Sequence, residues 1–504
     1  MELLFKKDYS EITKLPLLVE EFRAKKRCEP QTLSFSENPI QKSILKSKRK
    51  ELSEILYSEN LRLGASKKSL ENAKLIADEG CEIVITGQQP CLFTGPSYVI
   101  YKAITAVNLA EKLKREGKRA VAVFWVATED SDFSEVSSAE VGNDKYAIGA
   151  DTWKGVDIVG NGKIPCEMPS FLADFRKKPE IRDFGDFFCA LMSQIFAETG
   201  LVMCDPRALR GLTKEIKVHE IENPLCSTAI FTHVTDEVKA RGIKPQIDKS
   251  SDFVNLYLLD NGERKTLRYR DGAFFTLDGA SYSAEQLKNR ADELVPNAIL
   301  RPIIQEFLFS SRYLIAGANE LNYLLLLPKL FDYFDVKTPE FVLRNGFFLL
   351  DHNSTAFLKR FGIDFSEILT DKKLAFERML EMDENMRAFD EGCARVLREI
   401  DELRKISAKN DFTLGLSAEA TRKKVEKTLS VLRKKNINKL KRTEGNAVSE
   451  LVAVCEKILP QNGLQERYYN IFSYASSVSA AQNLISHLCT FSLEEGDVLG
   501  LSLP

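Results

Sequence analysis

The sequence is poor in the side chains from which protein metal centres are usually built. Only four histidines occur among 504 residues, and the ten cysteines are scattered without a Cys-x-x-Cys pair. Cys226 and His233 are close in sequence, but no second pair completes the four ligands of a zinc site. We therefore expect no metal site, and we interpret the cysteines as reduced, mostly buried thiols.

The sequence also lacks the motifs of common nucleotide-binding loops, membrane spans and secretory signals. The chain has neither a GxxxxGK[ST] nor a GxGxxG loop for phosphates, and no apolar run approaches the roughly 18 residues of a membrane span. The N-terminal segment MELLFKKDYSEITKL lacks the apolar core of a secretory signal. A formal net charge of -2 gives no general attraction to nucleic acid. We expect a cytoplasmic protein with neither membrane nor nucleic acid as partner.

What the sequence does contain is a strand–loop–helix–strand–loop unit at residues 81–136. Two apolar, β-branched runs, Glu82–Thr86 and Ala120–Ala127, predict strands, and Pro96 suits the first turn of the helix between them. Parallel strands joined by a right-handed crossover have both following loops at their carboxyl ends, where open α/β sheets bind ligands. The predicted fold class is α/β with a parallel-sheet core.

The first loop of this unit suits an anionic ligand. Its backbone N–H groups precede a helix, which favours a phosphate or carboxylate, and its glutamines offer both donors and acceptors. A lysine two turns into the helix is placed to reach a phosphate if it faces the cleft. The alternative is a tight turn whose amides satisfy only backbone groups. The candidate binding residues are Gly87, Gln88, Gln89, Thr94, Gly95, Pro96 and Lys102.

The second loop is acidic and supplies the candidate catalytic residues Glu129, Asp130 and Asp132. Clustered carboxylates can bind a substrate ammonium, hold Mg²⁺ or act as a general base on an amine. The alternative is capping of a following helix, since Asp-Phe-Ser-Glu resembles a helix N-terminus. The two roles are compatible.

A third cluster follows about two hundred residues later, where another glycine-bearing loop joins a strand to a helix. An arginine there can anchor a carboxylate bidentately or serve as a structural ion-pair partner. Its candidate binding residues are Arg301, Gln305, Asn319, Glu320 and Tyr323. By contrast, we expect Cys91 in the first loop to be incidental, because no histidine lies nearby in sequence to activate it.

Changes of pattern along the chain divide it into seven segments. Residues 1–136 hold N-terminal helices and the first half of the core, and 296–370 hold the second half, with strands at 313–316 and 340–343. The other predicted segments are a connective insertion at 137–183, a core strand with helices at 184–250, a small antiparallel insertion at 251–295, a helical coiled-coil hairpin at 371–459, and a C-terminal helical segment at 460–504 that packs on the core.

The hairpin prediction comes from apolar residues that follow a heptad seam from Phe376 to Leu403, a reversal at 410–415 and a less regular returning helix. Between Thr421 and Arg442 the returning helix has ten Lys or Arg and one acid. Such a run suits phosphates or nucleic acid, but it lacks interleaved aromatics. We favour a solvated coiled-coil face that the acids of the first helix partly offset.

Several short sequence motifs, in the order given next, resemble those of the bacillithiol-biosynthesis family BshC. They are TGQQ, LFTGP, YVIYK, the Glu-Asp loop after FW, PNAILRPIIQEFLF, AGANELNY, PEFVLRN and QERYYN. The resemblance implies a Rossmann-like core related to class I aminoacyl-tRNA synthetases, connective insertions, and a coiled coil that forms a homodimer. It also implies a ligase that adds cysteine to the amine of glucosaminyl-malate in the final step of bacillithiol synthesis.

Amide formation requires an activated carboxyl, and synthetase-like enzymes achieve this through an acyl-adenylate. The resemblance therefore implies ATP, with Mg²⁺ as a companion, although HIGH and KMSKS motifs are absent. The chain departs from the family pattern at Pro90-Cys91, at Ser131 and at Asn319. Two other hypotheses stay open: a non-catalytic coiled-coil scaffold, and a nucleotide-dependent transferase acting on another amine or RNA.

Overall fold

The computed structural model describes residues 1–28, 39–142, 144–149, 158–443 and 445–503. These residues form two compact units. The core unit comprises Asp8–Gly346 and Glu466–Val498, and the helical unit comprises Met1–Lys7, Phe347–Gln465 and Leu499–Pro504. The side chains of Cys28 and Leu440, and residues 150–157 of the expected insertion at 137–183, lie outside the described part.

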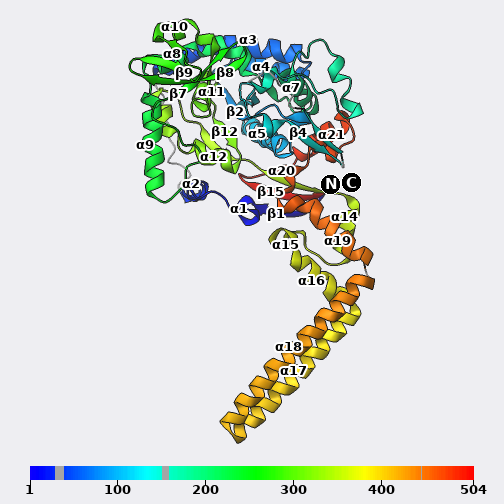
Figure 1. Cartoon of the computed structure of the whole chain (residues 1–504). Helices are drawn as coiled ribbons and strands as arrows, with labels where there is room; N and C mark the ends of the chain where they lie inside the picture. The colour runs from blue at the N-terminus through cyan, green and yellow to red at the C-terminus, as the bar shows by residue number, and fades with distance from the viewer. Residues whose placement is uncertain (29–38, 143, 150–157, 444, 504) are drawn as a thin grey trace. The chain divides into compact units, whose positions relative to one another are not determined.

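A five-stranded parallel sheet forms the centre of the core unit, in the order β13-β12-β2-β3-β6. Its strands are β2 (Cys81–Gln88), β3 (Arg119–Val126), β6 (Val202–Cys204), β12 (Tyr313–Ala316) and β13 (Glu340–Leu343). Helix α5 (Tyr98–Arg115) makes the crossover from β2 to β3 and packs on both (Figure 1). The predicted α/β class and Rossmann-like parallel sheet are confirmed.

The chain order of the strands reverses at β2. The next strands along the chain, β3 and β6, add on one side of β2, whereas the later strands β12 and β13 add on the other side. The side chains of β2 and β3 are almost all buried, which explains their continuous apolar, β-branched sequences. The reversal produces a switch point between β2 and β12, where ligands of open α/β sheets bind.

A second sheet of the core unit is antiparallel, in the order β10-β9-β8-β7-β11. Its strands are β7 (Phe253–Asp260), β8 (Glu263–Arg270), β9 (Ala273–Thr276), β10 (Ser281–Tyr282) and β11 (Leu294–Pro296). Asn261-Gly262 and Asp271-Gly272 have positive φ at all four positions, so the two hairpin turns predicted from them form as expected.

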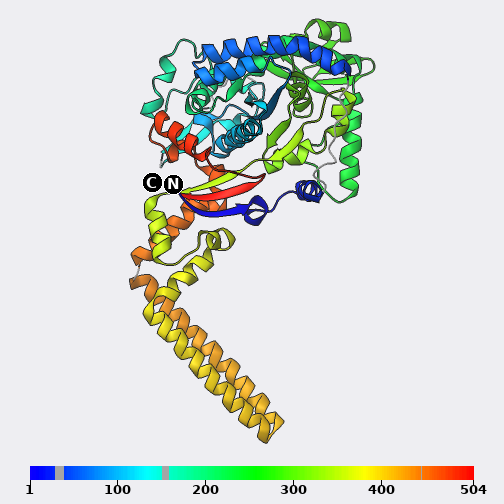
Figure 2. The same cartoon turned by 180° about the vertical axis from the view of Figure 1, so that it is seen from behind.

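The core unit has further helices and a two-stranded sheet, β4-β5, which are drawn in Figures 1 and 2. They are α1 (Tyr9–Ile12), α2 (Leu17–Cys28), α3 (Pro39–Arg62), α4 (Lys67–Leu75), α6 (Phe133–Val136), β4 (Ser138–Val141), β5 (Asp144–Ala147), α7 (Phe184–Ile195), α8 (Lys214–Glu222), α9 (Cys226–Ala240), α10 (Ala284–Asn289), α11 (Arg301–Phe309), α12 (Ala318–Leu324), α13 (Pro328–Tyr333), α20 (Gln465–Tyr468) and α21 (Val478–Leu488). No helix in the described residues is long and apolar enough to span a bilayer.

The helical unit combines a three-stranded sheet, in the order β1-β15-β14, with a long helical hairpin. Its elements are β1 (Glu2–Asp8), β14 (Gly346–Leu350), α14 (His352–Arg360), α15 (Phe365–Thr370), α16 (Lys372–Met382), α17 (Glu384–Asn410), α18 (Phe412–Thr443), α19 (Gly445–Ile458) and β15 (Asp497–Ser502). Helices α17 and α18 lie side by side in both views (Figures 1 and 2), which confirms the helical hairpin.

The basic residues of α18 are partly neutralised by acids of α17. Arg422 Nε lies 2.9 Å from Asp401 Oδ1, and Arg433 forms a bidentate pair with Asp390 at 2.8 and 2.9 Å. These contacts agree with the interpretation of the run as a coiled-coil face.

Several boundaries differ from the predictions because capping residues and prolines interrupt apolar patterns. Asp383 caps α17 through its side chain and so separates α16 from α17. Pro328 begins α13 as a helix separate from α12, and the reversal expected at 410–415 is the single residue Asp411. Strands β1 and β15 were not predicted, and the segment expected to be helical at 460–504 ends in β15.

Candidate active site

A pocket of about 450 Å³ lies at the carboxyl ends of the parallel strands. Residues at or just after the ends of all five strands line it, and this places it at the switch point between β2 and β12. Its volume falls in the range of small-molecule sites. Ten predicted site residues line it: Gly87, Gln88, Gln89, Lys102, Glu129, Asp130, Arg301, Asn319, Glu320 and Tyr323.

The TGP part of the first loop does not line the pocket. Asn470 Nδ2 donates hydrogen bonds to the carbonyl oxygens of Phe93 and Gly95, at 2.6 and 2.7 Å. Phe93, Thr94 and Gly95 all have positive φ, and a Cβ on Gly95 would lie 2.5 Å from that of Cys91. The residues Thr94, Gly95 and Pro96 therefore shape and anchor the loop, while Gln88 and Gln89 reach the pocket.

Two other predicted residues also lie outside the pocket lining. Gln305 is buried in α11, where it donates to Glu306 Oε1 at 3.0 Å. Asp132 is exposed and accepts a hydrogen bond from Ser134 Oγ at 2.7 Å. Gln305 points into the protein interior because of its position on helix α11. Asp132 lies outside the pocket because it is several residues beyond the end of β3.

Lys102 connects the two sides of the switch point. Its Nζ donates to Gly87 O at 3.0 Å, to Gln88 Oε1 at 2.8 Å and to Glu320 Oε2 at 2.6 Å. An ammonium has three N–H donors, so all three are used within the chain. Lys102 therefore positions the loops and supplies positive charge, rather than a free donor for a ligand.

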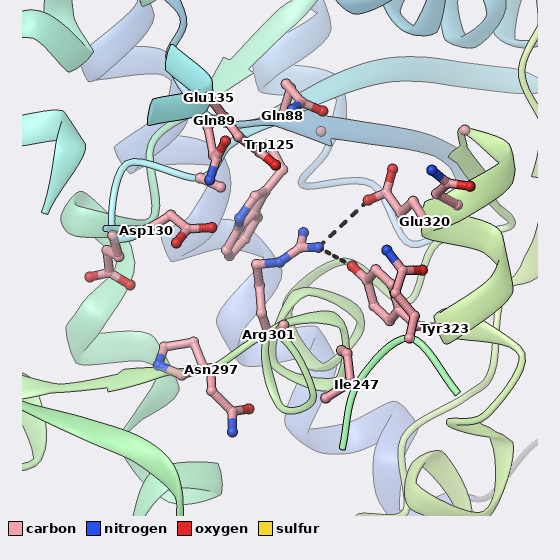
Figure 3. Close-up of a pocket in the computed structure, with 18 of the residues that line it drawn as sticks. Gln88, Gln89, Trp125, Asp130, Glu135, Ile247, Asn297, Arg301, Glu320 and Tyr323 are labelled. Carbon is pink, nitrogen blue, oxygen red and sulfur yellow. Dashed lines mark hydrogen bonds and ion pairs between the residues drawn. The ribbon is translucent and has the colours of Figure 1, made fainter. Parts of the chain in front are cut away.

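Arg301 lies on the opposite side of the same carboxylate. Its Nη2 donates to Tyr323 Oη at 2.6 Å and lies 3.5 Å from Glu320 Oε1, as the dashed lines in Figure 3 show. Burial acts to raise the pKa of Glu320, but Lys102 and Arg301 outweigh it and hold that pKa below its ordinary value. Burial raises the pKa of Tyr323 to about 12. Glu320 is thus an ionised, doubly paired acid.

The acidic loop lies across the pocket from this cluster. Glu129 is buried and paired with Arg210, whose Nε lies 2.6 Å from Glu129 Oε1. Asp130 is half-buried, and the nearest cation is Arg264 at 3.6 Å. Figure 3 shows the Trp125 ring between Asp130 and Arg301. The pocket therefore has an acidic side and a basic side.

Glu135 is an acid of this side that the sequence reasoning did not select. It lines the pocket, and burial together with the charges of Asp132 and Asp130 raises its pKa. A raised pKa makes a carboxylate a better proton acceptor near neutrality. The signal was present in the sequence, since Glu135 lies one helical turn beyond the acidic loop.

Within the described residues, no group of three or more His, Cys, Asp or Glu side chains is arranged to hold a metal ion. Cys91 is buried, its Sγ contacts Gln89 O at 3.3 Å, and burial raises its pKa to about 12. It is therefore a neutral thiol, as expected for an incidental cysteine.

Comparison with known protein families tests the resemblance to BshC that the sequence motifs suggested. The family model of the BshC N-terminal Rossmann-like domain in bacillithiol biosynthesis matches residues 21–345. The model of the BshC C-terminal coiled-coil domain matches residues 347–493. The chain belongs to the BshC family.

Curated relatives cover most of this BshC-family chain. A "Putative cysteine ligase BshC" of Salinibacter ruber is 28% identical over 86% of this chain and 85% of the relative. Proteins of the same name from Solibacter usitatus and Geobacillus kaustophilus are 28% and 27% identical, over 79% and 84% of this chain and 80% and 85% of the relatives.

A solved structure named "Putative arginyl t-RNA synthetase", from Campylobacter jejuni, covers 88% of this BshC-family chain and 99% of its own chain at 10% identity. The TM-score is 0.26, which is too low to establish a common fold.

Other pocket residues of this BshC-family chain were also missed by the sequence reasoning. They come from the start of α5, from strand ends or from distant segments, namely Tyr98, Trp125, Gln246, Lys249, Tyr257, Arg264, Asn297, Arg344 and Arg467. Arg344 and Trp125 lie at the ends of β13 and β3, so the strand-end rule applied to every predicted strand would have found them. Arg467 and Lys249 come from segments whose approach to the pocket depends on tertiary packing.

Proposed function

We propose that this chain is a cysteine ligase of bacillithiol biosynthesis. The reaction joins the carboxyl group of cysteine to the amine of glucosaminyl-malate, with loss of the elements of water, to form an amide. Family membership over both domains supports the proposal. The observation that carries it is the polarised pocket at the switch point, because its basic side matches the malyl carboxylates and its acidic side matches an amine.

The basic side orients the anion. Arg301 uses Nη2 for Tyr323 and Glu320, and its remaining N–H groups are directed to the pocket in this proposal. Gln88 is held by Lys102 and by Tyr98, so its side chain is fixed at the end of β2. A carboxylate bound here would be held by preorganised donors.

The acidic side receives the sugar amine. Asp130 binds the ammonium form, and Glu135 accepts a proton so that the free amine can attack the cysteine carboxyl carbon. The raised pKa of Glu135 favours this role. Glu129 is already paired with Arg210, so it positions the loop instead.

A free carboxylate does not form an amide without activation, and ATP would supply that activation. The unused N–H groups of Arg301 fit a phosphate as well as a carboxylate. Mg²⁺ in such sites is held by one or two carboxylates together with the phosphates of the nucleotide. The donor set of the pocket thus fits a nucleotide.

We further propose a homodimer formed through α17 and α18, in the cytoplasm. Large apolar side chains of this hairpin are exposed in the single chain, namely Leu403, Ile406, Phe412, Leu414, Leu416, Val431 and Leu432. Contiguous exposed apolar side chains are typical of association surfaces.

Thiol profiling of a strain lacking this gene tests the proposed function. We expect bacillithiol to disappear and glucosaminyl-malate to accumulate, and the wild-type gene should reverse both changes. A gene copy encoding Asp130→Asn should restore much less bacillithiol than a copy encoding Asp132→Asn, which changes the neighbouring acid outside the pocket. Unchanged bacillithiol in the deletion strain would refute the proposal.

A further inference from the structure

Arg344, which follows β13, has one N–H group that finds no partner in the described part of the chain. Its two terminal nitrogens use all four N–H groups: Nη1 donates to Glu466 Oε2 at 2.7 Å and to Asn345 O at 2.9 Å, and Nη2 donates to Glu466 Oε1 at 2.5 Å and to Tyr9 Oη at 2.8 Å. The Nε is buried and has no hydrogen-bond partner among the described residues. Buried donors are nearly always paired, so this one needs an explanation.

Gly317 borders the same place. A Cβ at this glycine would lie 3.7 Å from Arg344 Nε and 3.9 Å from Lys102 Cε, which are ordinary contact distances. The backbone of Gly317 has φ -74° and ψ 164°, which any residue adopts. Neither strain nor crowding therefore requires glycine here. With glycine at this position, no side chain covers the pocket wall next to Arg344 and Lys102.

The surroundings of this space are cationic. Lys102, Arg301, Arg344 and Arg467 line this side of the pocket, and the carboxylates of Glu320 and Glu466 neutralise only part of their charge. Lys102 uses all three of its N–H groups within the chain, whereas Arg344 Nε, near Gly317, has no hydrogen-bond partner among the described residues. An anion there would meet a fixed donor that carries a positive charge.

We propose that the space beside Gly317 is a subsite for a carboxylate or phosphate group, which accepts a hydrogen bond from Arg344 Nε. Arg344 is then a specificity-determining residue of the pocket. The pair with Glu466 and the contact with Tyr9 lock the guanidinium, so a ligand oxygen is selected by position as well as by charge. Naming that group as a malyl carboxylate rests on the proposed function, whereas the oxyanion subsite itself does not.

The test fills the space without disturbing the backbone. Gly317→Val places a branched side chain beside Arg344 Nε, and the exposed Gly211→Ala, which meets no atom within 4 Å, is the control. Binding of L-malate, of inorganic phosphate and of ATP to the full chain is measured by calorimetry, and the melting temperature is measured for each variant. We expect Gly317→Val to weaken at least one of these anions tenfold or more, with Gly211→Ala unchanged.

Which of the three anions Gly317→Val binds more weakly identifies the chemical group that occupies the subsite. Weakening of malate alone assigns the subsite to a carboxylate, and weakening of phosphate and ATP assigns it to the nucleotide. Equal affinity of Gly317→Val and the wild-type chain for all three anions would overturn the proposal, as would failure of the wild-type chain to bind any of them.

Arg344→Lys is a second variant in case valine impairs folding, since it keeps the charge near Glu466 but removes the Nε donor. It should weaken the same anion as Gly317→Val, and unchanged affinities would again overturn the subsite. A wild-type chain that binds malate but makes no bacillithiol would refute only the proposed function, so the two failures are distinguishable.

Discussion

Lys102 Nζ lies 2.6 Å from Glu320 Oε2, although the two residues are 218 positions apart in the sequence. One belongs to the crossover helix after β2 and the other to the helix after β12. The pair therefore joins the two chain segments that meet at the switch point. It explains why the pocket is assembled from two halves of the core.

The Lys102–Glu320 pair should stabilise the fold, and replacing only one of the two residues should destabilise it. Lys102→Met leaves the mostly buried carboxylate of Glu320 with only the longer contact to Arg301, and we expect a loss of roughly 3–5 kcal/mol in the free energy of unfolding. The double variant Lys102→Met/Glu320→Gln should recover part of that loss. Urea unfolding of both variants checks this, and equal stability of the single variant and wild type would contradict the assigned role.

The acids near the end of β3 should differ in importance according to their position. Glu135→Gln should lower the rate of ligation by about 10²–10⁴-fold, the usual range for an acid–base group. Asp130→Asn should also lower the rate, because it removes the charge that binds the substrate ammonium. Asp132→Asn should change the rate less than twofold, because Asp132 is exposed and outside the pocket. Steady-state rates of the three variants test this prediction. An equally large effect of Asp132→Asn would contradict the different roles assigned to Asp132 and to the pocket acids.

Glu220 should make stability depend on pH near neutrality. It is buried in α8, its Oε1 accepts from Ser227 Oγ and Asn255 N, and burial raises its pKa to about 7 from 4.5. Between these values the folded chain holds a proton that the unfolded chain has released, so this group's contribution to stability falls as pH rises from 4.5 to 7.

Glu220→Gln cannot ionise and keeps an acceptor for Ser227. Relative to wild type, its free energy of unfolding should therefore increase with pH across that window, by on the order of 3 kcal/mol in total. The exposed Glu51→Gln should track wild type at every pH. A pH-independent difference between Glu220→Gln and wild type would contradict the assigned pKa shift.

The cysteines should react according to burial. Cys166 and Cys226 are exposed, whereas Cys91 is buried with its pKa raised to about 12. We expect iodoacetamide at pH 8 to label the first two in the native chain and Cys91 only after unfolding. Peptide mass spectrometry reads this out directly. Rapid native labelling of Cys91 would reopen the question of a catalytic thiol.

The first half of the site was predictable because local patterns mark it. The apolar runs of β2 and β3 end in Gly87-Gln88-Gln89 and Glu129-Asp130, and strand ends of a parallel sheet meet at one edge. The roles of individual side chains were less accessible. Lys102 was expected to reach a phosphate, yet its three donors are used by partners that only the tertiary structure brings together.

The features that the sequence did not predict depend on contacts between residues that are far apart in the chain. Arg344 acquires its role from Tyr9 and Glu466, which are 335 and 122 positions away. Asn470 anchors the loop at 93–95 across more than 370 positions. Strands β1 and β15 come from opposite ends of the chain and pair with each other, which no local pattern signals.

The central claim is that this chain joins cysteine to glucosaminyl-malate. Its most direct test is incubation of the purified chain with cysteine, glucosaminyl-malate and ATP, followed by mass spectrometry of the thiol products. We expect bacillithiol to form in proportion to enzyme, to require all three compounds and to be greatly reduced with Asp130→Asn. Absence of bacillithiol from a folded wild-type chain, with all three compounds intact, would contradict it.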